Sequence, residues 1–264
     1  MNARLRPILR IVMLLLFGAC SFLLPAQEID IQSEDDKPVE ERIVYERQNT
    51  TRIAIHSQGF AAGFRIGRIK TIKRTTFWEV ELASLHSTKE IKTVNVSTYN
   101  TSPYVYGKLN AAFVLRAGSG AERLIYGKPY WGGVDIRWNY EVGASVAMLK
   151  PYYYYVLVFY PTSTGFDEVV EEQTFEQKDN WVDIIGRAPF FKGFDQLKFS
   201  PGAHASLGIS FEFGKSRTRV RLINLKAVAE GFPMGVPIMD GQSNPWFYLT
   251  LQLSYSWGSR FNKY

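Results

Sequence analysis

The sequence predicts an all-β protein, an antiparallel transmembrane β-barrel of about eight strands that follows a cleaved signal peptide. The first observation is the segment 246–257, in which apolar and polar residues alternate without interruption. Its apolar face consists of Phe247, Leu249, Leu251, Leu253, Tyr255 and Trp257. Such alternation indicates a β-strand, and the length suits a tilted bilayer crossing of about 9–11 residues. The other two observations are that the pattern recurs and that it follows an export signal; a soluble β-sandwich is the alternative.

The export signal occupies residues 1–26. Three arginines precede an apolar run from Ile11 to Leu24, and the small residue Ala26 follows. This order is typical of a secretory signal peptide. Cleavage after Ala26 would leave no cysteine, because the chain's single cysteine is Cys20. Lipidation at Cys20 is the alternative, but the apolar run continues beyond Cys20, where a lipoprotein would turn polar.

The mature chain divides into an extension and a barrel. Residues 27–50 contain eight acidic residues against Lys37, Arg42 and Arg47, so we expect an acidic, flexible N-terminal extension. The barrel is then expected over residues 51–264, which carry the excess of positive charge. A basic barrel is compatible with anionic lipid. The charges do not cluster as on a nucleic-acid-binding surface, and an exported chain is not expected to bind nucleic acid.

Eight candidate strands follow the extension, and a ten-stranded barrel is the alternative. They lie near residues 51–68, 76–85, 110–123, 131–149, 151–160, 198–214, 218–231 and 245–259. If the N-terminus starts in the periplasm, the turns at 149–151 and 214–217 are periplasmic and short, while the long loops 161–197 and 232–244 are external. The segment 86–109 is the exception, because this order of strands places a long link on the periplasmic side.

The polar faces of these strands carry full charges, which would point into a membrane barrel. The expected interior charges are Arg65, Glu79, Glu81, Arg116, Asp135, Arg137, Glu141, Glu212, Arg219 and Arg221. Five charges of each sign suggest mutual neutralisation, and the interior of an eight-stranded barrel is just wide enough to be filled by side chains. We therefore expect a salt-bridged plug. A narrow pore for ions or small solutes is the alternative, which clusters of one sign would have favoured.

The loop after the fifth expected strand combines acidic and aromatic residues. The residues of interest are Asp167, Glu168, Glu171, Glu172, Phe190, Phe191 and Phe194. The acidic part is interpreted as a solvated loop, with a divalent cation as an alternative ligand, although the spacing does not match an EF-hand. The aromatic part would be unusual in free solution, so it is expected to dock on the barrel mouth or on a partner.

The sequence offers little chemistry. Histidine occurs only at positions 56, 86 and 204, and no metal-binding, phosphate-binding or nucleophile motif is present, so neither a metal nor a cofactor is expected. The one pair of interest is His204 and Ser206, because barrel enzymes that remove acyl chains from lipid A use a His-x-Ser pair. Both side chains fall on the polar face of their strand, whereas a lipid would meet the outward face. A non-enzymatic protein is therefore expected.

The chain resembles small outer-membrane β-barrels of the Bacteroidota type, within an uncharacterised group. The stretches that carry the resemblance are 89–92, 106–110, 128–134, 190–195 and 236–239, which read KEIK, YGKLN, KPYWGGV, FFKGFD and VPIM. The resemblance implies a fold and a location in the outer membrane of a Gram-negative bacterium, but no activity. The expected function is a structural or accessory component of an outer-membrane assembly. Outer-membrane lipid and other outer-membrane proteins are the expected partners.

Overall fold

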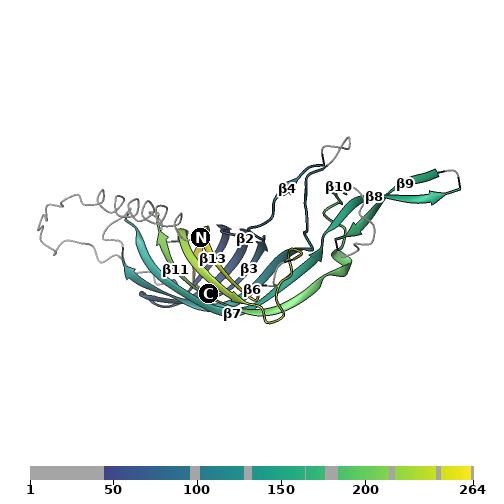
Figure 1. Cartoon of the computed structure of the whole chain (residues 1–264). Helices are drawn as coiled ribbons and strands as arrows, with labels where there is room; N and C mark the ends of the chain where they lie inside the picture. The colour runs from purple at the N-terminus through teal and green to yellow at the C-terminus, as the bar shows by residue number, and fades with distance from the viewer. Residues whose placement is uncertain are drawn as a thin grey trace, which may run out of the picture. The chain divides into compact units, whose positions relative to one another are not determined.

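Eight antiparallel strands pair in a closed ring in the order β1–β13–β12–β11–β7–β6–β3–β2 (Figure 1). They are β1 Arg47–His56, β2 Gly59–Thr71, β3 Arg74–Leu85, β6 Asn110–Tyr126, β7 Asp135–Pro151, β11 Lys198–Glu212, β12 Arg219–Gly231 and β13 Phe247–Phe261. The first strand pairs along its whole length with the last, from Arg47 opposite Phe261 to His56 opposite Gln252, which closes the ring. The predicted all-β, eight-stranded antiparallel barrel is confirmed.

The structure is a computed structural model. It describes residues 45–95, 102–127, 133–163, 165–175, 184–213, 218–241 and 245–262. The predicted signal peptide, with Cys20, and most of the predicted extension 27–50 lie outside the described residues. All described residues belong to one compact unit, Val44–Tyr264.

Further strands lie beyond one end of the barrel. β8 (Tyr153–Thr162) follows β7 after a single residue and forms a three-stranded sheet with β9 (Gly165–Thr174) and β10 (Ile184–Arg187), in the order β10–β8–β9. β4 (Lys92–Thr93) and β5 (Tyr104–Val105) form a short ladder, and η2 (Phe194–Gln196) is a single 3-10 turn. Among the described residues, no helix is long and apolar enough to cross a membrane.

Two of the predicted strands were assigned wrongly. The segment 51–68 is a hairpin of β1 and β2, whose tight turn lies at Ser57 and Gln58. The outward residues are odd-numbered in β1, such as Ile55, and even-numbered in β2, such as Phe60, so the parity changes at the turn. The segment 151–160 is β8, which lies outside the barrel. The two errors cancel, which is why the predicted number of strands was right.

The corrected strand order removes the exceptional long link. Both described ends of the chain and the connections 72–73, 127–134 and 213–218 lie at one end of the barrel. The segment 86–109 lies at the opposite end together with 152–197 and 232–246, so its expected periplasmic position was wrong. Outer-membrane barrels have short periplasmic turns and longer external loops. The end with the termini is therefore the periplasmic end, and the other is the external end.

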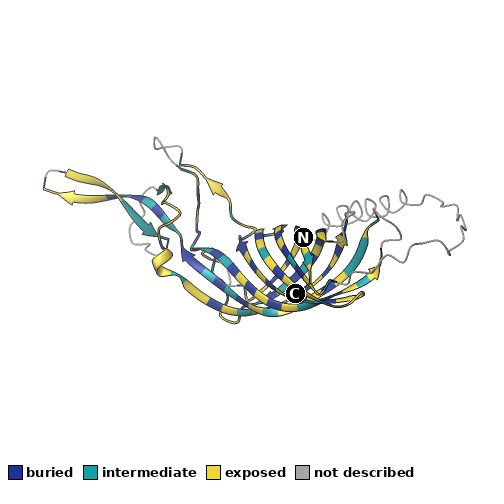
Figure 2. Cartoon of the chain, turned by 180° about the vertical axis from the view of Figure 1, so that it is seen from behind, coloured by how far each residue is buried: buried dark blue, intermediate teal, exposed yellow. Residues whose placement is uncertain are grey.

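The two faces of the barrel differ in polarity as expected for a membrane barrel. Buried and exposed residues alternate along each strand (Figure 2). Exposed aromatic residues gather at the external end (Phe60, Phe199, Trp246 and Phe247) and at the periplasmic end (Trp78, Trp138, Tyr140, Phe211, Tyr255 and Trp257). Two aromatic girdles around an apolar band are the surface of a transmembrane β-barrel of the outer-membrane type.

Candidate functional site: the lumen and the external end

The centre of the lumen is filled by a network of buried charges around Glu79. Its carboxylate pairs with Arg52, with Arg65 at 2.5 Å and with Lys226 at 3.3 Å. Arg65 also pairs with Glu122. All five side chains are almost completely buried. Because buried charges are costly unless they are paired, this degree of pairing is what allows a charged interior to be stable.

Arg116 joins two further carboxylates in the same network. Its Nη1 donates to Glu81 at 2.6 Å, and its Nε and Nη2 donate to the two oxygens of Glu230 at 2.8 and 2.9 Å. Glu81 also accepts a hydrogen bond from Gln252 at 2.9 Å, and Glu230 accepts one from Ser145 at 3.2 Å. The bidentate Arg116–Glu230 pair has the geometry that makes charge-assisted hydrogen bonds strong.

A chain of polar groups runs through His204. Its Nδ1 lies 2.9 Å from Ser145 Oγ, and its Nε2 lies 3.4 Å from Glu141 Oε1. Ser206 donates to Glu141 at 3.3 Å, and Lys226 lies 3.5 Å from the same carboxylate. Serine, histidine and glutamate are the residue types of a catalytic triad. All three are buried inside the barrel, however, on the side of the wall away from the bilayer.

A second, smaller charge cluster lies at the periplasmic end of the lumen. Arg137 lies 3.7 Å from Asp135 and 3.5 Å from Glu212, while Arg260 pairs with Glu212 at 2.5 Å and donates to Gln48 at 3.0 Å. Arg137 and Asp135 are partly exposed, in contrast to the central network. The looser contacts of Arg137 indicate a weaker interaction than those of Arg116.

Most of the predicted interior charges lie inside the barrel, but two do not. The side chains inside are those of Arg65, Glu79, Glu81, Arg116, Asp135, Arg137, Glu141 and Glu212. Arg219 and Arg221 are exposed, so their expected inward position was wrong. On β12 the even-numbered residues Val220 and Leu222 face inward, which turns the two arginines outward at the periplasmic interface.

Four charged members of the central network were missed by the sequence analysis. They are Arg52, Glu122, Lys226 and Glu230. The signal for two of them was present, because Lys226 and Glu230 share their parity with Asn224 and not with Ile223 and Leu225. Arg52 was hidden by the missed turn between β1 and β2, which inverted the parity of that strand.

The external mouth of the lumen is closed by apolar side chains. Phe232 and Val236, from the connection between β12 and β13, are fully buried among Leu85, Val114 and Tyr248. This connection is also tied to the rim by hydrogen bonds. Leu109 N donates to Ile238 O at 2.8 Å, Asn110 donates to Pro237 O at 2.8 Å, and Asp240 N donates to Gly107 O at 2.7 Å. The stretches 106–110 and 236–239 thus meet to cover the mouth.

The acidic residues of the predicted loop belong to a strand. Asp167, Glu168, Glu171 and Glu172 lie on β9, which pairs with β8 in a hairpin. Tyr160 donates a hydrogen bond to Glu171, which lowers the pKa of the Glu171 carboxyl and raises the pKa of the phenol. The remaining acidic residues, Glu176, Asp179 and Asp183, lie outside the described residues. The described residues contain no group of three or more potential metal ligands.

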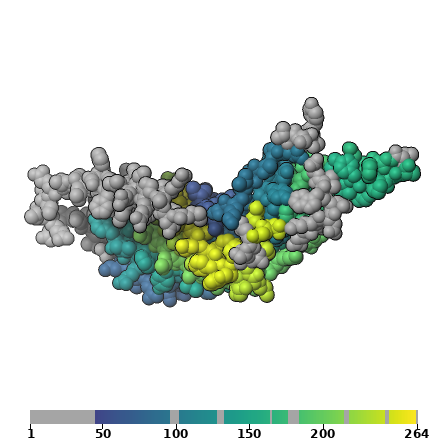
Figure 3. Space-filling view, in the orientation of Figure 1, coloured from purple at the N-terminus to yellow at the C-terminus, as the bar shows by residue number. Residues whose placement is uncertain are grey.

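The base of the β8–β9 hairpin is anchored, whereas its distal half, residues 159–162 and 165–170, is exposed and has no anchor among the described residues. Tyr154 donates to Val105 O at 2.7 Å and accepts a hydrogen bond from Lys108 N at 2.8 Å. Burial raises the pKa of this phenol. In the distal half, by contrast, Phe166 is 73% and Val170 54% exposed, and that half stands apart from the other coloured atoms (Figure 3).

The aromatic residues of the predicted loop gather beside the outer wall of the barrel. Phe190 contacts Phe191 and Phe194, with ring centroids 5.6 Å apart in both pairs, and it meets Phe113 of β6 edge-on at 6.4 Å. Phe113 shares the outward parity of β6 with Leu115. The cluster therefore lies beside the outward surface at the external end, where an aromatic girdle is expected.

Comparisons with known proteins found likenesses among solved structures. No model of a protein family and no curated protein matches the chain. The similar structures include Neisserial surface protein A (8% identity, TM-score 0.39, 81% of this chain and 96% of that one). They also include the attachment invasion locus protein Ail of Yersinia pestis (6% identity, TM-score 0.35, 81% of this chain and 95% of that one). A third is the N-terminal β-barrel domain of Pseudomonas aeruginosa OprF (8% identity, TM-score 0.34, 80% of this chain and 96% of that one). At this level of similarity the likenesses do not bear on function.

Proposed function

We propose that the protein is a non-enzymatic barrel with a plugged lumen in the outer membrane of a Gram-negative bacterium. In this proposal it is an accessory component of an outer-membrane assembly, and it binds another outer-membrane protein through the distal half of the β8–β9 hairpin. The observation that carries the proposal is the exposure of this half on both of its faces. The Bacteroidota lineage suggested by the sequence stays a prediction.

The composition of the hairpin supports a protein partner. Phe159, Phe166 and Val169 are exposed, and an isolated two-stranded ribbon is only marginally stable in water. Exposed apolar residues within a polar surround are a common feature of interaction sites. The neighbouring residues Asp167 and Glu168 give this surface a negative charge, so the complementary surface of the partner should be basic.

The content of the lumen argues against a pore. Ion conduction needs a continuous polar path, whereas here an apolar layer containing Phe232 and Val236 covers a network of paired charges. We expect no reproducible channel steps from the pure protein in planar bilayers. Such steps would overturn the plugged lumen and favour the pore.

The position of His204 argues against a lipid-modifying enzyme. Ser145 and His204 are 1% and 4% exposed and face the lumen, so an acyl chain in the bilayer would have to cross the barrel wall to reach them. Lipid A mass spectra should therefore be the same in a deletion strain and its parent. A change in acylation that Ser145→Ala reproduces would refute this part of the proposal.

The partner surface can be tested in cells by photo-crosslinking. A photoreactive residue at Phe166 or Val170 should give discrete adducts with one outer-membrane protein, because both side chains are exposed on the free half of the hairpin. The matched control is Leu251, which is 63% exposed but lies on the bilayer-facing surface of β13 and should give only lipid adducts.

A shortened variant provides the second arm of this test. Residues 160–167 are replaced by Asn-Gly, which closes the hairpin between the paired residues Phe159 and Glu168 with a turn that hairpins prefer. The barrel should keep its heat-dependent gel migration, while adduct formation at Val170 should be lost. Protein adducts that are absent at both hairpin positions, or that persist in the shortened variant, would contradict the proposal.

A further inference from the structure

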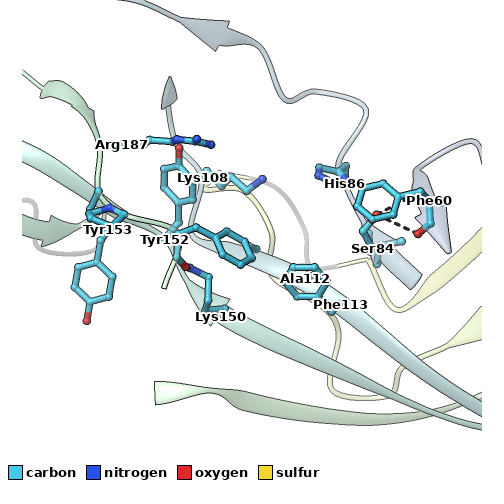
Figure 4. Close-up of a pocket in the computed structure, with 15 residues that line it drawn as sticks. Phe60, Ser84, His86, Lys108, Ala112, Phe113, Lys150, Tyr152, Tyr153 and Arg187 are labelled. Carbon is cyan, nitrogen blue, oxygen red and sulfur yellow. Dashed lines mark hydrogen bonds between the residues drawn. The ribbon is translucent and has the colours of Figure 1, made fainter. Parts of the chain in front are cut away.

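A cavity of about 240 Å³ lies at the external rim of the barrel, between the ends of β2, β3 and β6 and the segment that follows β10 (Figure 4). Phe60, Ser84 and His86 lie on one side of it, and Tyr152 and Arg187 on the other. Pockets that enclose a whole small ligand measure roughly 300–1,000 Å³. This cavity is smaller, so it suits one chemical group of a larger molecule.

One wall of the cavity belongs to the bilayer-facing surface. Phe60 and Phe113 both point outward, on β2 and β6, and Phe190 packs edge-on against Phe113 at 6.4 Å. Phe60 is 64% and Phe190 51% exposed. In a membrane these aromatic rings would meet acyl chains at the level of the external girdle.

Lys150 places a positive charge at the end of this apolar surface. It has the outward parity of β7, and it follows an outward run from Ile136 to Met148 that contains no charge. A run of this length is about 40 Å long, or about 28 Å across the bilayer at a tilt of about 45°. If Ile136 lies at the periplasmic interface, Lys150 therefore lies at the external headgroup level.

The ammonium group of Lys150 lacks an acidic partner among the described residues. Its Nζ donates to the backbone carbonyls of Phe190 at 2.7 Å and Lys192 at 3.0 Å, and it lies 4.9 and 5.3 Å from the ring centroids of Phe190 and Phe194. The residue is only 4% exposed. A buried charge without a counter-ion is costly, so this site is short of one anion.

The remaining charged residues around the cavity also leave an excess of positive charge. Lys108 pairs with Glu90 at 2.7 Å. In the described chain, Glu90 is the one carboxylate that pairs with a cation lining the cavity, and this pair neutralises it. Arg187 is exposed and forms no ion pair with a described residue. Of the three lysine and arginine side chains that line the cavity, only Lys108 therefore pairs with a carboxylate of the described chain, and aromatic rings bound the cavity on one side.

We propose that this cavity binds the phosphate group of an anionic lipid in the outer leaflet. The phosphate would lie between Lys150 and Arg187, and the acyl chains would continue from the cavity along Phe60 and Phe113 into the bilayer. Guanidinium and ammonium groups are the side chains that recognise phosphate, and rings at the interface contact the first carbons of the chains. The site would fix a lipid at one position of the external rim, beside the base of the β8–β9 hairpin.

The test compares a phospholipid with two probes that each lack one half of it, either the phosphate group or the acyl chains. Phosphatidic acid, diacylglycerol with the same acyl chains, and inorganic phosphate are added to the purified full-length protein in a neutral detergent, and binding is measured by native mass spectrometry and by titration. Phosphatidic acid should bind, and diacylglycerol and inorganic phosphate should bind at least about tenfold more weakly, because each lacks one half of the recognised group. Equal binding of diacylglycerol, or of inorganic phosphate, would overturn the proposal of a phosphorylated lipid.

Two variants assign the binding to the cavity. Arg187→Gln removes an exposed charge that forms no ion pair with a described residue. It should weaken the binding of phosphatidic acid by about tenfold or more while the barrel keeps its heat-dependent migration. Lys150→Gln should have at least the same effect. The matched control is Arg68→Gln, which removes an exposed arginine near the periplasmic end of β2 and should leave the affinity unchanged. Unchanged affinity in Arg187→Gln, or equal losses in all three variants, would refute the site.

Discussion

Removal of the Arg116 side-chain charge should strongly destabilise the barrel. Arg116→Met keeps an unbranched stem but removes the guanidinium group and its three charged hydrogen bonds, one to Glu81 and two to Glu230. The two carboxylates are affected differently. Glu81 keeps the hydrogen bond that Gln252 donates to it at 2.9 Å. For Glu230, the only other hydrogen-bond donor in the described chain is Ser145, at 3.2 Å. The variant therefore leaves a buried carboxylate almost unpaired.

The expected loss follows from this difference. Hydrogen bonds to charged groups contribute about 1.5–3 kcal/mol each, and breaking one member of a buried ion pair costs about 3–5 kcal/mol. We expect the free energy of unfolding of Arg116→Met to fall by about 3–5 kcal/mol. Equilibrium unfolding in urea with the protein in lipid vesicles, followed by tryptophan fluorescence, measures this quantity.

Two controls make the reasoning refutable. Arg123→Met removes an exposed arginine from the same strand and should change the free energy of unfolding by no more than about 0.5 kcal/mol. Adding Glu230→Gln to Arg116→Met should restore about 1–3 kcal/mol, because the orphaned charge is gone. If Arg116→Met were no more destabilising than Arg123→Met, or if the second substitution restored nothing, the buried pairs would not be what stabilises this lumen.

Three further predictions follow from the geometry. Arg137→Ala should lower the thermal unfolding temperature less than Arg116→Met but more than Glu171→Ala. The carboxylates that pair with Arg137 lie farther away, at 3.5 and 3.7 Å, while Glu171 lies in the external hairpin. Differential scanning calorimetry of the three variants would show this order. Replacing both Phe232 and Val236 by Ser should open the apolar cover of the mouth and raise the hydrogen exchange of β12 amides; unchanged exchange would contradict a plug. The Tyr160 hydrogen bond lowers the folded-state pKa of Glu171, so its stabilisation of the hairpin should be full above the ordinary glutamate pKa of about 4.3 and be lost as the pH falls through the lowered value. NMR titration of the Glu171 side chain should show this shift, and Tyr160→Phe should reduce it, leaving the smaller contribution of the hydrogen bond from Gln173.

The alternation of residues determined much of this fold by itself. In β13, β7 and β11 the period of two fixes which side chains can share a face, so residues such as Glu141 and Glu212 could be assigned to the interior without coordinates. Strands with one apolar face and one charged face suit a barrel with a bilayer outside and paired charges inside, and their recurrence favoured the barrel over the alternative of a soluble sandwich.

Tertiary structure decided what the pattern could not. A two-residue turn at 57–58 reverses the chain within a segment that reads as one strand, so one apparent strand was two. The expected side of the links as far as 151 changed with it, until the miscounted β8 restored the order of the later loops. The partners of a charge are also not local. Arg116 and Glu230 are 114 positions apart, and they meet because the sheet curls into a barrel, so that β6 and β12, which are separated by β11 and β7, face the same narrow lumen. The alternation along a strand determines the direction of a side chain, but only the closure of the barrel determines which side chain it meets.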